Sequence, residues 1–104
     1  MVQDLAGNIL AWNKGAQQMY GWTEAEALKM NINEFVPEDK LSELKSFIEK
    51  IAKGQPVESF KSQRKTKPGK ILDVWSTGTA LSDESGQLTE IAITERDLAW
   101  LADN

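Results

Sequence analysis

The order of predicted elements in this 104-residue chain indicates an α+β fold, a five-stranded antiparallel sheet with helices packed on one face. Two short apolar segments near the N-terminus form a hairpin, and three β-type segments follow residue 57. The helical segments lie between these two groups of strands. Because short turns join antiparallel strands, the predicted order is β-β-α-α-α-β-β-β within one domain.

The first hairpin pairs Met1–Asp4, which reads as a clipped first strand, with a second strand at Ile9–Trp12. Side chains alternate between the two faces of a strand, so Leu10 and Trp12 share one face. Both faces of this strand are apolar, and one of them cannot be covered by the helices. We therefore expect a homodimer with Leu10 and Trp12 at its interface.

Capping signals define the helices. Asn13 is a good N-cap, and Gly21 suits the left-handed residue that ends a helix. Thr23 and Glu26 have the spacing of a capping box, which predicts the start of a second short helix. The third predicted helix covers residues 37–53, and its apolar stripe consists of Leu41, Leu44, Phe47, Ile48 and Ile51.

Three strands complete the predicted sheet at Val57–Thr66, Ile71–Leu81 and Leu88–Glu95, separated by turn-forming segments. The sequence changes character again near its end. We expect residues 1–98 to form the domain and residues 99–104 to start a connector helix. The alternative is a tail that folds back onto the sheet, with Trp100 filling a gap.

The composition argues against several classes of function. The chain contains no His and no Cys, so the usual ligands of structural zinc and iron–sulfur clusters are missing and no metal site is expected. The net charge of −4 argues against nucleic acid as the main partner. No apolar run approaches the roughly 20 residues that a membrane span needs. We expect a cytoplasmic domain, while a membrane anchor elsewhere in a longer parent chain stays open.

No catalytic constellation is evident. The candidate carboxylates are scattered over turns and polar strand faces without an adjacent base or oxyanion hole, so we expect a non-catalytic domain. Two of them buried together in one pocket would favour an enzyme instead. These candidates are Asp73, Asp83, Glu84 and Glu95.

A basic cluster lies on the hairpin that follows residue 57. It would suit an acidic partner or nucleic acid, but a solvent-exposed strand pair also explains it. The second explanation is favoured, because Phe60 is the only aromatic residue interleaved with the charges. The cluster consists of Lys61, Arg64, Lys65, Lys67 and Lys70.

Several segments, in their order and spacing, resemble PAS domains, the small sensory modules of bacterial signalling proteins. They are DLAGNILAWN at 4–13, GAQQMYGWTEAEAL at 15–28, VPED at 36–39 and TERDL at 94–98, together with the turns KPGK and DESG. The chain looks most like PAS domains of sensor histidine kinases and of chemotaxis methylesterase–methyltransferase fusions. It departs from the family pattern at three positions. Lys29 stands where Gly is frequent, Pro68 replaces an Asp in a turn, and Ala99 replaces a Thr whose hydroxyl fastens the domain exit.

The resemblance implies a sensory module of a two-component system, with a small molecule held between sheet and helices. It also implies a covalently linked effector domain further along the parent chain. Arg96 and Asp97 would then form a clasp at the signal exit. The candidate ligand-lining residues are Met19, Trp22, Leu28, Ile32, Phe35, Phe47, Ile48, Trp75, Thr77 and Ile93.

The cofactor, if one binds, stays unknown from the sequence. Haem-binding members use a His ligand and flavin-adduct members use a Cys, and this chain has neither residue. A flavin held without a covalent bond remains open. The alternative for the candidate lining is a filled core, in which case the domain mediates dimerisation and binds no ligand.

Overall fold

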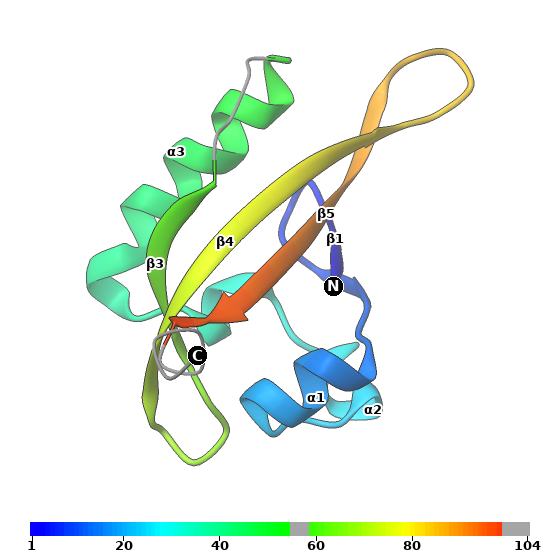
Figure 1. The fold of residues 1–104 in the computed structure, drawn as a ribbon. Coiled ribbons are helices and arrows are strands. Elements are labelled where there is room, and N and C mark those ends of the chain that lie inside the picture. The colour runs from blue at the N-terminus through cyan, green and yellow to red at the C-terminus, as the bar shows by residue number, and fades with distance from the viewer. Residues whose placement is uncertain (55–58, 99–104) are drawn as a thin grey trace.

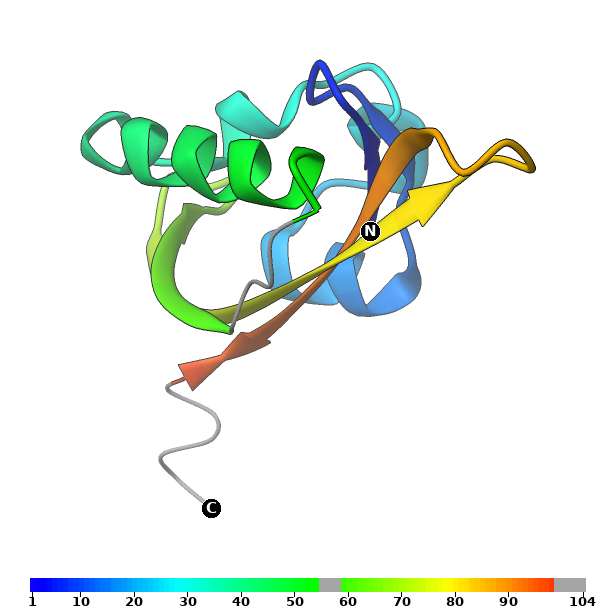
Figure 2. The same ribbon diagram turned by 90° about the horizontal axis from the view of Figure 1, so that it is seen from above.

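The computed structural model describes residues 1–54 and 59–98. It confirms the predicted fold class: five antiparallel strands form one sheet in the order β2-β1-β5-β4-β3, and the helices lie between β2 and β3 in the chain (Figures 1 and 2). The strands are β1 Val2–Asp4, β2 Ile9–Ala11, β3 Phe60–Lys65, β4 Ile71–Ser82 and β5 Leu88–Asp97. The α-helices are α1 Lys14–Tyr20, α2 Glu24–Ala27 and α3 Leu41–Ala52, and the 3₁₀ helices are η1 Ile32–Phe35 and η2 Glu38–Lys40.

The predicted helix ends are confirmed. Asn13 caps α1, because its Oδ1 accepts a hydrogen bond from the backbone N–H of Ala16 at 2.8 Å. Gly21 ends α1 in the left-handed conformation, with φ 91°. Both hydrogen bonds of the capping box join Thr23 and Glu26. The third helix lies where the sequence predicts it, but its first turn is the separate 3₁₀ helix η2.

An aromatic cluster joins the end of β2, the segment between α1 and α2, and η1. The rings of Trp12 and Phe35 stack with centroids 5.1 Å apart, and Trp22 meets Phe35 edge-on at 4.9 Å. The expectation that Trp12 lies on the exposed face is wrong, since only 3% of its surface is accessible. Strand β2 ends at Ala11, so strand alternation no longer sets the direction of Trp12. Its indole N–H instead donates to the backbone oxygen of Trp22 at 2.9 Å.

Helix α3 packs against the sheet at Gly78 of β4. A Cβ at this position would lie 2.6 Å from the ring tip of Phe47 and 2.9 Å from Ile51 Cδ1. Both side chains are buried, so α3 can approach this closely only because residue 78 has no side chain.

We predict that Gly78→Ala destabilises the fold by about 1–3 kcal/mol, because the added methyl group overpacks the contact with Phe47. Gly15→Ala is the matched control. A Cβ at Gly15 finds its nearest neighbour at 3.5 Å, and Ala is the better helix former in α1 by about 1 kcal/mol. Urea unfolding of both variants tests this, and an unchanged or raised stability of Gly78→Ala would contradict the packing described.

Candidate functional site: the outer sheet face and the ion pair beneath it

The outer sheet face, the side of β3, β4 and β5 turned away from the helices, is covered by no element of the described chain (Figure 2). Strand register sets its residues in rows. Lys61, Trp75 and Arg96 are direct neighbours in one row, and Thr77 and Thr94 form the next. All five are exposed, and Trp75 has 42% of its surface accessible. A large aromatic residue flanked by two cations therefore stands on an open sheet.

A shallow depression of about 350 Å³ lies next to Trp75 on this face, bordered also by Thr77, Thr94 and Arg96. Ser59 completes its border and shares a hydrogen bond with the hydroxyl of Thr77. The rim is thus aromatic on one side and lined by hydroxyl groups on the other. Such a surface can receive an apolar side chain and satisfy polar groups around it.

Three predictions for the ligand lining are wrong. Trp75 and Thr77 point outward, because the inward positions of β4 are taken by Val74, Ser76 and Gly78. Leu28 is 44% exposed, because the buried residue at the end of α2 is Ala27. Leu10, predicted for the dimer face, is exposed at 46%.

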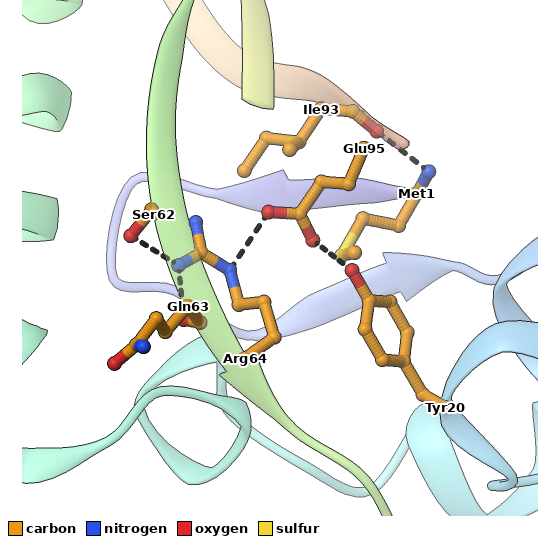
Figure 3. Close-up of polar contacts among 7 residues, drawn as sticks. All are labelled: Met1, Tyr20, Ser62, Gln63, Arg64, Ile93 and Glu95. Carbon is orange, nitrogen blue, oxygen red and sulfur yellow. Dashed lines mark hydrogen bonds and ion pairs between the residues drawn. The ribbon is translucent and has the colours of Figure 1, made fainter. Parts of the chain in front are cut away.

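The inner face of the same strands holds a buried ion pair. Arg64 Nε of β3 lies 2.7 Å from Glu95 Oε2 of β5, and each side chain is only 1% exposed (Figure 3). The guanidinium also donates through Nη1 to Ser62 Oγ at 2.9 Å and to the backbone oxygen of Gln63 at 2.7 Å. A buried charge is tolerated only when paired and hydrogen-bonded, and both conditions are met by Arg64.

Tyr20 connects this ion pair to helix α1. Its hydroxyl donates to Glu95 Oε1 at 2.7 Å, and burial, followed by the charge of Glu95, holds the pKa of Tyr20 well above its ordinary value. The phenol therefore stays protonated and keeps donating. The backbone oxygen of Tyr20 accepts from the N–H of Lys67 in the β3–β4 turn at 2.8 Å. The end of α1 is thus held by β5 and by the β3–β4 hairpin at once.

Strand alternation connects the ion pair to the outer face. Glu95 points inward, while its neighbours Thr94 and Arg96 are exposed on the outer side. Three successive residues of β5 therefore place one side chain on the buried pair and two on the open surface. The buried Glu95 and the exposed Thr94 and Arg96 are thus consecutive residues of one strand.

The pairing of the two was not predicted, because Arg64 was expected in a solvent-exposed cluster and Glu95 among the candidate catalytic carboxylates. A signal was available in β5, where Glu95 continues the inward series of Ile91 and Ile93. A charge at a position that alternation places in the core needs a partner of opposite charge. Of the four candidate carboxylates only Glu95 is buried, so the pair of buried carboxylates that an enzyme would need is not formed.

The other seven predicted lining residues lie in or against the hydrophobic core. Ile32, Phe35, Phe47 and Ile93 are buried in the core, and Met19, Trp22 and Ile48 pack against it partly buried. At the predicted exit, Arg96 is exposed and Asp97 is half-buried. Contacts of this exit with residues 99–104, and the predicted connector helix itself, lie outside the described residues.

A separate cleft of about 390 Å³ lies between α3, η1 and the β1–β2 turn. Ile32, Leu44 and Ile48 contribute apolar walls, and Lys45 and Glu49 of α3 lie at the border. The turn that forms the opposite wall is held in place, because Asn31 Nδ2 donates to the backbone oxygen of Ala6 at 2.9 Å. The volume is within the range of small-molecule sites, about 300–1,000 Å³.

The described residues offer neither a metal centre nor a membrane-spanning helix. No group of three or more acidic side chains there is placed to hold a metal ion. Within the same ranges, 1–54 and 59–98, none of the helices has the length and apolar character required to cross a bilayer.

The strand order and the single helical layer define a small α+β domain of the sensory-module class. The family profile of the PAS fold matches residues 1–98, and the chain belongs to the PAS family. PAS domains are in general non-catalytic modules of signalling proteins. A comparison with curated proteins found no match.

Solved PAS structures share this fold. A PAS domain from Colwellia psychrerythraea superposes with a TM-score of 0.85 at 24% identity, over 92% of this chain and 81% of that one. A sensory box histidine kinase/response regulator from Burkholderia thailandensis superposes with a TM-score of 0.74 at 13% identity, over 98% of this chain and 77% of that one. The PAS-B domain of Drosophila melanogaster Cycle superposes with a TM-score of 0.77 at 15% identity, over 92% of this chain and 95% of that one.

We predict that breaking the ion pair from either side is costly. Arg64→Met and Glu95→Leu should each lower the free energy of unfolding by about 3–5 kcal/mol, since each leaves the other group buried without its counter-charge. The double variant Arg64→Met/Glu95→Leu should cost less than the sum of the single changes. Chemical denaturation measures all three, and strictly additive effects would show that the two groups do not interact.

Proposed function

We propose that this PAS domain is a signal-transduction module that dimerises through its outer sheet face and relays its internal state through β5 to an effector in the parent chain. The observation that carries the proposal is the exposed Trp75, seated in an open row between Lys61 and Arg96. Trp and Arg are the side chains most often found at the energetic centre of protein interfaces.

The signal route follows from the position of Glu95. A change in the interior that weakens the hydrogen bond from Tyr20 or the pairing with Arg64 would shift the end of β5. Because Thr94 and Arg96 lie on the outer face, such a shift alters the surface by which two copies meet. The signal then passes as a change in dimer geometry, biased by differences in free energy between two states.

We expect the wild-type domain to form a dimer, and Trp75→Ala to weaken it by about tenfold or more, as for an interface hot spot. Leu28→Ala is the matched control, because Leu28 is equally exposed, at 44% against 42% for Trp75, but lies outside the outer face. Sedimentation equilibrium over a range of concentrations gives the dimer dissociation constants of the wild type and of both variants. A wild-type protein that stays monomeric at millimolar concentration, or equal effects of the two changes, would refute the proposal.

A second candidate function is small-molecule binding, supported by the cleft beside α3. Its apolar walls suit a small apolar compound, in which an acidic group could pair with Lys45 at the border if it lies away from Glu49. One wall is preformed by the fastened β1–β2 turn, which lowers the ordering cost of binding.

Ile48→Trp tests this second candidate by filling the cleft. We expect ligand-observed NMR with a library of small carboxylic acids to detect weak binders of the wild type, and expect the larger side chain to remove their signals. The control is Trp75→Ala, which changes the opposite side of the domain. Binders that are unaffected by Ile48→Trp, or the absence of any binder, would leave the cleft without a ligand role.

A further inference from the structure

The charges of the outer sheet face are separated along the strands. One end carries Lys61, Lys65 and Arg96 on the outward positions of β3 and β5, and these three cations outnumber the one outward carboxylate of the described residues at this end, Asp73 of β4. The other end carries Asp4 and Glu90, which the register places on the outward positions of β1 and β5. The β4–β5 turn adds Asp83 and Glu84 beyond this acidic end, and it projects from the domain opposite to the β3–β4 turn (Figure 1).

From this separation we infer that the second copy lies antiparallel on the outer face, about a twofold axis that runs across β4 and β5, so that Arg96 of each copy faces Glu90 of the other. The inference rests on the proposed dimer and specifies its arrangement. Both residues lie on β5, six positions apart, or about 20 Å at 3.4 Å per residue. The axis therefore crosses β5 midway between them, close to the level of Ala92 and Thr94.

The symmetry of the contact selects this arrangement. Two identical sheet faces can meet about an axis parallel to the strands or about an axis across them. An axis parallel to the strands places the basic end of one copy against the basic end of the other, and the acidic end against the acidic end. The second puts each basic end on an acidic end, and like charges juxtaposed at an interface cost far more than complementary ones.

The side chains near the axis allow the two sheets to approach. Thr77, Thr79, Ala92 and Thr94 are small, and they occupy adjacent rows of β4 and β5. The large side chains lie to either side of these rows. Trp75 lies on the basic side and Leu81, 36% exposed, on the acidic side, so the antiparallel arrangement packs the Trp75 of each copy towards Leu81 of the other.

The two key charges are available for such contacts. Within the described part of the chain, neither Arg96 nor Glu90 makes an ion pair or a side-chain hydrogen bond. Asp4 is held in its ionised form, because the hydrogen bonds from Asn8 lower the pKa of its carboxyl group. The acidic end is therefore negative at neutral pH.

Charge reversal tests the arrangement. We expect Arg96→Glu and Glu90→Arg each to weaken the dimer by about tenfold or more, because each places two pairs of like charges across the axis. The double variant Glu90→Arg/Arg96→Glu restores the opposite-charge contacts and should dimerise within about threefold of wild type. Sedimentation equilibrium at low ionic strength, where such contacts are least screened, gives the four constants.

Matched reversals on the helical side control for net charge. Glu38→Arg in η2 and Lys53→Glu at the end of α3 alter exposed residues and should leave the dissociation constant of the dimer unchanged. If the wild type dimerises but the double variant is as weak as the two single changes combined, the antiparallel arrangement is wrong while the proposed dimer stands. A monomeric wild type overturns both.

A distance measurement gives an independent result. The chain has no cysteine, so Glu84→Cys in the β4–β5 turn accepts a single nitroxide label. The antiparallel dimer places the two labels at opposite ends of the interface. Each label lies about six residues from the axis along the strand, at about 3.4 Å per residue, so the two labels are about 40 Å apart. Pulsed electron paramagnetic resonance should report this distance, whereas one near 20 Å or less would indicate the axis parallel to the strands.

Discussion

The ion pair between Arg64 and Glu95 constrains the rest of the domain. Both side chains are almost fully buried, and the phenol of Tyr20 is hydrogen-bonded to the same carboxylate. A buried pair of this kind adds little net stability over an apolar pair of equal volume, but separating its members is expensive. The relative positions of β3, β5 and α1 are therefore specified by a contact that tolerates little displacement. The N–H of Lys67 adds the β3–β4 turn to this arrangement by donating to the backbone oxygen of Tyr20.

This constraint gives the two faces of the sheet different roles. The inner face is specified by shape and pairing, as shown by Gly78, whose missing side chain admits Phe47 of α3. The outer face has no comparable packing from the described chain, and its exposed Trp75 and threonine rows do not need a fixed neighbour for folding. Because interiors are close-packed, a local change inside is transmitted as a displacement and is not absorbed. Under the proposed function, the end of β5, which belongs to both faces, is where such a displacement would reach the surface.

Features set by neighbours in the sequence could be predicted, and features set by distant partners could not. The caps of α1 and α2 depend on residues three or four positions apart, and both were predicted correctly. The inward face of β4 was not, because Ile71 and Trp75 make the outward positions as apolar as Leu72 and Val74 make the inward ones. Arg64 looked like one more charge in a basic hairpin, since its counter-charge lies 31 residues further along the chain.

The charge balance of the chain suits a reversible dimer. Each copy carries a net charge of −4, so two copies repel one another at long range. At physiological ionic strength this repulsion is screened beyond about 8 Å, whereas opposite charges in contact across an interface are screened less. Association then depends on local complementarity at the ends of the outer face and on a modest apolar contact around Trp75. An interface with these properties would respond to small displacements of Arg96. Few contacts attract the two copies, and the net charges of the copies repel one another. In the proposed dimer, the separation of charge along β5 therefore makes association sensitive to the strand that also carries the buried Glu95.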